Sequence, residues 1–138
     1  MRKRVVDFLI ALFLSPIILS AQSKALNCGS IREGTFYFYP LNPQGKFKVI
    51  RDGFIQKEIN SKTSDTSFWK IDWTNDCVLS LKFIRSSQQM SNAQKLFFGS
   101  HITVIKVIGI RKEYYLFSGG LDSISRNSAV DTLWLKPR

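Results

Sequence analysis

The chain has 138 residues, a formal net charge of +10 and an aromatic content of 13%. Its aromatic content excludes an intrinsically disordered chain, and its length is that of one domain with a single hydrophobic core. The excess of basic over acidic side chains either attracts anionic partners or only keeps the protein soluble.

The first segment has the three-part order of a secretory signal peptide. Basic residues 2–4 precede an apolar stretch from Phe8 to Leu19, which is followed by Ser20-Ala21-Gln22. The apolar stretch is shorter than the ~20 residues that a transmembrane helix needs. We therefore expect residues 1–21 to form a signal helix that is cleaved after Ala21, with an uncleaved anchor as the alternative.

Cleavage leaves residues 22–138 as one secreted or periplasmic domain that is not transmembrane once processed. Removal of residues 1–21 takes away three basic and one acidic side chain, so the formal charge becomes +8. In an oxidising compartment the two cysteines, Cys28 and Cys77, are expected to form a disulfide, with reduced buried thiols as the alternative.

Beyond residue 30, apolar and polar residues alternate with period two in short runs separated by turn residues. Runs at this spacing predict an all-β fold in which sequential strands pair antiparallel, as an up-and-down barrel or, alternatively, a β-sandwich. The eight predicted strands are Thr35 to Tyr39, Phe47 to Arg51, Phe54 to Ile59, Ser67 to Trp73, Val78 to Ile84, Ile102 to Ile108, Glu113 to Phe117 and Val130 to Leu135.

Two segments break this alternation. Residues 88–98 are predicted to form one or two helical turns that end at Gly99, with Met90, Leu96 and Phe97 on the core, or else a long loop. Residues 119–128 are predicted to form a second, polar loop.

The dipeptide Asp52-Gly53 is a strong signal for a two-residue hairpin turn. That turn would pair Arg51 with Phe54 and Lys48 with Lys57. One face would then carry Phe47, Val49 and Phe54 together with the polar residues Arg51, Gln56 and Glu58. The other face would carry the lysines Lys46, Lys48 and Lys57, either solvated or holding an anionic group.

Several of these residues also carry a resemblance. The order Cys28, Gly34-x-Phe36, Arg51, Gln56-x-Glu58, Trp73-x-x-x-Cys77-x-Leu79 is similar to that of a group of small exported bacterial proteins of uncharacterised function. The Gly-x-aromatic start of the first strand also resembles the lipocalin superfamily, whose members have Trp at the position of Phe36. The lipocalin resemblance implies a barrel whose mouth admits a small apolar or amphiphilic ligand.

No motif indicates catalysis, a cofactor or a metal. His101 is the one histidine, and the sequence contains no Gly-x-Ser-x-Gly segment to present a nucleophile. Two cysteines expected to be bonded leave no ligand cluster for a metal. Glu58 and Asp72 are a conceivable carboxylate pair, but any domain with this many acids offers such pairs. We therefore expect a non-catalytic protein.

Two binding functions remain. In the first, the barrel binds a small apolar or amphiphilic ligand in its lumen, with Arg51, Gln56 and Glu58 as the polar residues on the apolar face. Their alternative role is a mutual salt bridge at the rim. In the second, the basic outer face binds an anionic glycan, a lipid surface or a partner protein. Export argues against nucleic acid as the partner.

Overall fold

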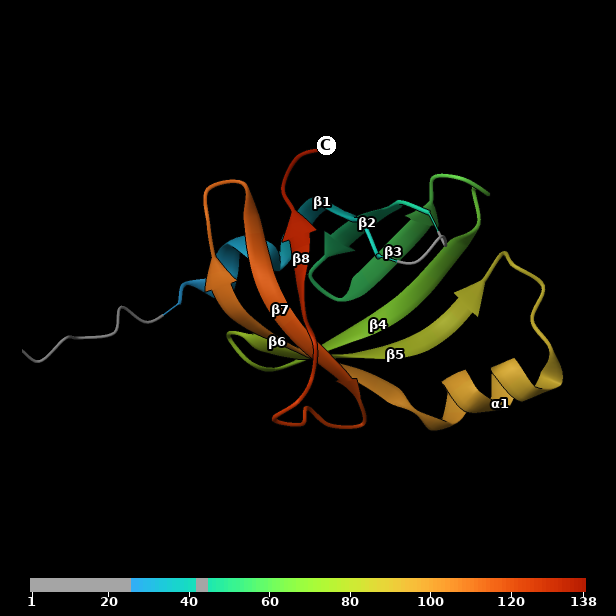
Figure 1. Ribbon diagram of the computed structural model, residues 1–138. Coiled ribbons are helices and arrows are strands. Elements are labelled where there is room, and N and C mark those ends of the chain that lie inside the picture. The colour runs from blue at the N-terminus through green and yellow to red at the C-terminus, as the bar shows by residue number, and fades with distance from the viewer. Residues whose placement is uncertain (1–25, 42–44) are drawn as a thin grey trace, which may run out of the picture.

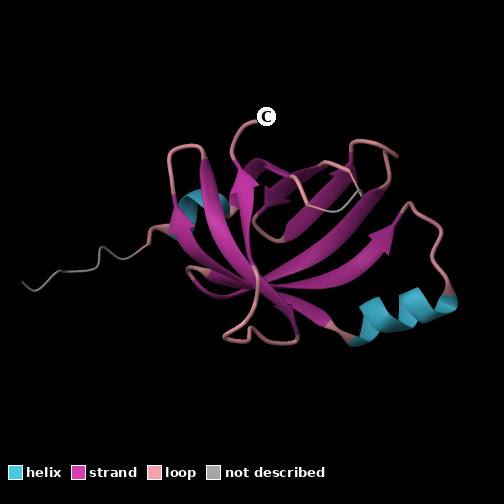
Figure 2. Cartoon of the chain, in the orientation of Figure 1, coloured by secondary structure: helices cyan, strands magenta, loops and turns pink. Residues whose placement is uncertain are grey.

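The computed structural model describes residues 26–41 and 45–138, so the predicted signal peptide lies outside the described residues. Eight antiparallel strands pair in sequence order and close into a barrel, which confirms the predicted up-and-down topology (Figure 1). Closure between the first and last strands is short and joins Tyr37 to Trp134 and Phe38 to Leu133. Figure 2 shows that most of the described chain is in strands.

The strands agree with the predicted runs, with ends shifted by a few residues. They are β1 (Glu33–Phe38), β2 (Phe47–Asp52), β3 (Ile55–Asn60), β4 (Thr66–Asn75), β5 (Val78–Ser86), β6 (Ile102–Ile110), β7 (Tyr114–Leu121) and β8 (Val130–Trp134). Two helices complete the described part, the 3-10 helix η1 (Cys28–Ile31) and α1 (Asn92–Ser100).

The two ends of the barrel differ. At one end η1 lies over the lumen, and its residues Cys28 and Ile31 are buried against Phe36, Val107 and Tyr115. The connections that follow β1, β3, β5 and β7 lie at the other end, where α1 is found (Figure 1). We call these the closed end and the mouth.

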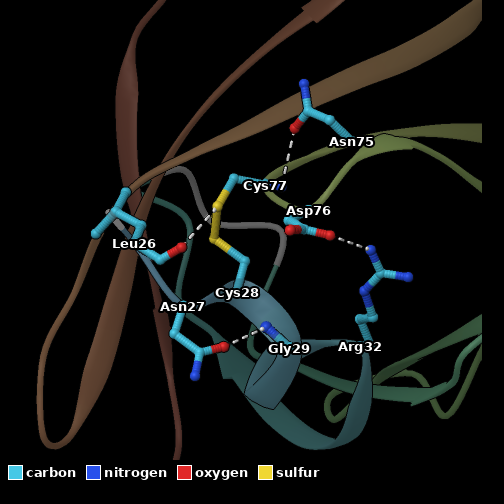
Figure 3. Close-up of a disulfide and its surroundings, with 8 residues drawn as sticks. All are labelled: Leu26, Asn27, Cys28, Gly29, Arg32, Asn75, Asp76 and Cys77. Atoms are coloured by element: carbon cyan, nitrogen blue, oxygen red, sulfur yellow. Dashed lines mark hydrogen bonds and ion pairs between the residues drawn. A yellow bond between two sulfur atoms is a disulfide. The ribbon is translucent and has the colours of Figure 1, made fainter. Parts of the chain in front are cut away.

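The predicted disulfide is confirmed. Cys28 and Cys77 are bonded with their Cα atoms 5.3 Å apart, across a sequence separation of 49 (Figure 3). The bond joins η1 to the β4–β5 turn. Beside it, Arg32 forms an ion pair of 3.2 Å with Asp76 and stacks on Trp73. The disulfide therefore pins the closing helix to the barrel wall.

The predicted register of the β2–β3 hairpin is wrong by two residues. Arg51 pairs with Gln56, not Phe54, because Asp52 Oδ1 accepts the backbone N–H groups of both Phe54 and Ile55 and lengthens the loop. Gly53 at φ +95° completes this loop. Phe54 is consequently 77% exposed and does not lie on the inner face.

A shift of two residues preserves the faces of a strand, because side chains alternate with period two. Phe47, Val49, Arg51, Gln56 and Glu58 therefore still share the inner face, as predicted.

The segment between β5 and β6 contains a regular helix. Met90, which precedes it, is partly buried and lines a cavity, but the predicted packing of Leu96 and Phe97 is wrong. A capping box between Ser91 and Gln94 starts α1. Leu96 is 72% exposed and Phe97 is also exposed, whereas Phe98 packs on Trp69 and Phe83. The helix contributes one aromatic ring to the mouth and directs the other apolar side chains outward.

The second predicted loop is also shorter than expected. β7 continues through Gly119, Gly120 and Leu121, which pair with β6. Two adjacent glycines are uncommon in a strand, so the sequence does not indicate that the strand continues here. Gly120 is required there because a Cβ atom would collide with the backbone of Ser123.

Candidate functional site

The lumen contains a cavity of about 330 Å³, within the size range of small-molecule sites and roughly twice the volume of a cavity that accepts benzene. Six large side chains lie on the inner side of the barrel without filling the lumen: Phe36, Phe38, Trp73, Leu81, Phe83 and Phe117. The cavity lining consists of Phe38, Phe47, Val49, Arg51, Gln56, Glu58, Trp69, Leu81, Thr103, Ile105, Tyr115, Phe117 and Leu133.

The three predicted polar residues are brought together as one hydrogen-bonded row on the lumen wall. Arg51 Nε donates to Gln56 Oε1 at 2.7 Å, and Gln56 Nε2 donates to Glu58 Oε1 at 2.6 Å. Gln56 therefore lies between the guanidinium and the carboxyl group, in place of the direct salt bridge considered as their alternative role. The row runs along β2 and β3 from the closed end towards the mouth.

Two side chains of β4 extend this row. Ser67 Oγ donates to Glu58 Oε2 at 3.5 Å, and Trp69 Nε1 donates to Ser67 Oγ at 3.0 Å. Burial raises the pKa of Glu58, and its hydrogen bonds and the charge of Arg51 only partly counteract this. The lumen wall therefore makes the Glu58 carboxyl easier to protonate than an exposed one.

Arg51 is the buried cation of the lumen, with only 4% of its surface exposed. Its Nη1 donates to Ile31 O at 3.1 Å, and the guanidinium lies over the rings of Phe36 and Tyr115. Within the part of the chain that the structure describes, no carboxylate lies at ion-pair distance from it. The lumen therefore carries a positive charge that is not directly paired.

Tyr115 adds an unused polar atom to the same cavity. The residue is 1% exposed, and its hydroxyl makes no hydrogen bond to any described residue. Burial raises the pKa of this phenol. The charge of Arg51 and a polar contact with its guanidinium oppose this shift, although the contact falls outside hydrogen-bonding geometry. Buried hydroxyls normally have a partner, so this one is available to a molecule in the cavity.

A second cavity of about 450 Å³ lies at the mouth and shares Phe47, Glu58 and Trp69 with the first. Asn60, Thr63, Gln88 and Gln94 are among its polar lining residues, and Phe98 of α1 closes one side. The lining is thus mostly apolar in the inner cavity, apart from the row of Arg51, Gln56 and Glu58, and more polar in the outer cavity.

The three predicted lysines, Lys46, Lys48 and Lys57, lie on the outer side of the hairpin. Lys48 pairs with Ile59 and Lys57 with Ile50, so the predicted pairing of the two lysines is wrong for the same reason as the turn register. Lys46 lies over the ring of Tyr39, and Lys57 over that of Phe68.

His101, the histidine noted in the sequence, contacts Asp122. Its Nδ1 lies 2.6 Å from Asp122 Oδ2, and both side chains are exposed. The backbone N–H of Ile102 and then His101 lower the pKa of Asp122. The pair links the end of α1 to the end of β7. Among residues 26–41 and 45–138 no three His, Cys, Asp or Glu side chains are grouped as for a metal ion.

Sequence reasoning placed Arg51, Gln56 and Glu58 on the lumen wall but missed Tyr115, Ser67 and Trp69 as site residues. The alternation of Tyr115 with Phe117 signals a common inner face. Sequence alone gives no register between β7 and β2, so the approach of Tyr115 to Arg51 has no local signal.

Comparison with protein-family models, with curated proteins and with solved structures found no match for this chain. Within the described ranges, no helix has the length and apolar character needed to cross a membrane.

Proposed function

We propose that this protein is a non-catalytic carrier or sensor that binds one small amphiphilic molecule inside its barrel after export. The supporting observation is the lumen cavity, in which an apolar lining meets a short row of hydrogen-bonded polar groups. This combination is typical of small-molecule sites, where apolar surface provides affinity and a few polar groups orient the ligand.

The disulfide and the signal-like N-terminal sequence support an extracytoplasmic location. Cys28 and Cys77 form a disulfide. Disulfides persist in oxidising compartments and are rare in the cytosol. The proposed sequence of events is cleavage after Ala21, folding of residues 22–138 and disulfide formation. N-terminal sequencing of the exported protein tests the first step.

Calorimetric titration with decanol, a neutral amphiphile, tests lumen binding. Thr103 lines the cavity, so Thr103→Phe fills it with a ring and is expected to weaken decanol binding by about tenfold or more. Thr132→Phe is the matched control, because Thr132 adjoins the buried Leu133 on β8 and faces the other side of the sheet. Equal affinity of both variants and the wild-type protein would reject the lumen as the site.

A second candidate function is binding of an anionic glycan, lipid or partner protein by the basic outer face. The observation that favours it is an outward cationic group, in which Lys57 and Arg85 both lie over the ring of Phe68, the latter at 3.9 Å. The double variant Lys48→Glu, Lys57→Glu should then lose retention on an anionic matrix, and retention should fall with added salt. Unchanged retention would exclude this surface.

A further inference from the structure

The polar groups at the inner end of the cavity indicate which chemical class of ligand the lumen binds. This inference rests on the proposed function. Arg51 donates from Nε and Nη1 to neutral acceptors, Gln56 Oε1 and Ile31 O. These are the two hydrogen bonds that the guanidinium makes to described residues, and it also lies against the ring of Tyr115. A buried guanidinium is normally paired with an anion, because removing a charge from water is costly.

Glu58 does not supply that anion by direct contact. Gln56 lies between the two side chains, and burial favours the protonated form of Glu58. The positive charge of Arg51 is thus only indirectly compensated within the lumen.

Tyr115 provides a second donor next to this charge. The guanidinium carbon of Arg51 lies 5.8 Å from the centre of the Tyr115 ring, and both residues line the 330 Å³ cavity. The phenolic hydroxyl is buried and has no partner in the described part of the chain. A guanidinium with neutral partners and a phenol without a hydrogen bond suit a group with two acceptor oxygens and one negative charge.

We infer that the lumen ligand is an anionic amphiphile of the medium-chain carboxylic acid class, with its carboxylate between Arg51 and Tyr115. A phosphate ester fits less well, because it carries more charge and more acceptor oxygens than these two donors satisfy. The hydrocarbon chain then extends along Leu81, Ile105 and Phe117 towards the mouth.

The distribution of charge sets this orientation. Glu58 lies further along β3 towards the mouth than Gln56, and it lines both the inner and the outer cavity. A carboxylate near Glu58 would lie beside another carboxyl group and further from the cation, whereas one at the closed end meets Arg51 and Tyr115. The charged head therefore points inward.

The test is calorimetric titration of the disulfide-bonded protein with decanoate and with decanol, which share a chain length and differ in charge. We expect decanoate to bind about tenfold or more tightly than decanol, in line with a charge-assisted hydrogen bond. Tyr115→Phe should weaken decanoate binding by about fivefold or more. Tyr114→Phe, on the outer face of the same strand, is the matched control and should change nothing.

A third variant, Arg51→Met, should remove the preference for decanoate while decanol still binds. Its folding is checked by circular dichroism, and if it fails to fold, Tyr115→Phe and the two wild-type titrations decide the question. Decanol binding as tightly as decanoate would overturn the carboxylate assignment and leave lumen binding standing. Binding of neither probe would overturn both.

Discussion

Arg51 donates a hydrogen bond of 3.1 Å from Nη1 to the carbonyl oxygen of Ile31, and so ties the lumen wall to the helix that closes the barrel. The same guanidinium lies over Phe36, whose ring packs edge-on against Tyr115. One side chain therefore serves both the candidate site and the closed end, and binding and stability should be coupled at this position.

The first prediction concerns this coupling. Arg51→Met should lower the free energy of unfolding by about 2–4 kcal/mol, because Ile31 O and Gln56 Oε1 lose a charged donor and remain buried. Urea denaturation measures the change. Lys48→Met, on the exposed face of the same strand, should change stability by no more than about 0.5 kcal/mol. Equal stability of the two variants would show that Arg51 does not hold the closed end.

The disulfide should contribute to stability mainly by restricting the unfolded chain. Its closed loop spans 49 residues, for which the chain-entropy argument gives about 4 kcal/mol as an upper figure. The double variant Cys28→Ser, Cys77→Ser should lose up to this amount in chemical denaturation, and the reduced wild-type protein should behave in the same way. A variant as stable as the oxidised protein would contradict this account of η1 and the β4–β5 turn.

Much of this fold follows from the sequence, because alternation with period two marks each strand and its inner face independently of the exact register. Arg51, Gln56 and Glu58 were placed on one face even though the predicted turn was two residues too short. The error came from Asp52, whose carboxylate accepts two backbone N–H groups and lengthens the loop. The Asp52-Gly53 dipeptide predicts a turn, but it does not indicate these side-chain hydrogen bonds.

Features that depend on distant strands were not predictable in the same way. Tyr115 approaches Arg51 only because β7 and β2 face each other across the closed barrel. Phe98, rather than Leu96 or Phe97, packs at the mouth because α1 touches the barrel along a narrow strip. Helical periodicity suggests an apolar face but does not say which residues the rest of the fold will cover.

Glu58 should make stability depend on pH. Burial raises its pKa above the ordinary value of 4.5, so the folded state holds the proton more tightly than the unfolded state. The contribution of protonated Glu58 to folding stability is fully present below pH 4.5 and is lost as the pH rises through the raised pKa. Glu58→Gln should therefore melt at a higher temperature than the wild-type protein near neutral pH, with the difference shrinking below pH 4.5.

Thermal melts of Glu113→Gln provide the control for this experiment, because Glu113 is an exposed carboxyl in the β6–β7 turn. Its difference from the wild-type protein should stay small at both pH values. A Glu58→Gln variant that is less stable than the wild-type protein near neutral pH would mean that the ionised carboxylate stabilises the fold, contrary to this prediction.

Tyr115 offers a stability test that is independent of any ligand. Tyr115→Phe removes a buried hydroxyl that has no partner among the described residues, so unfolding should require the same free energy or up to about 1 kcal/mol more. Urea denaturation of this variant and of Tyr114→Phe gives the comparison. A loss of more than about 1 kcal/mol would reveal a partner for the hydroxyl and remove it from the candidate site.

The most direct measurement of the central claim is an NMR experiment that records nuclear Overhauser effects between bound decanoate and the protein. We expect contacts from the ligand chain to the side chains of Leu81, Ile105 and Phe117, and from the carbon next to the carboxylate to the ring of Tyr115. Contacts confined to exposed residues such as Leu96 and Phe97, with none inside the barrel, would contradict it.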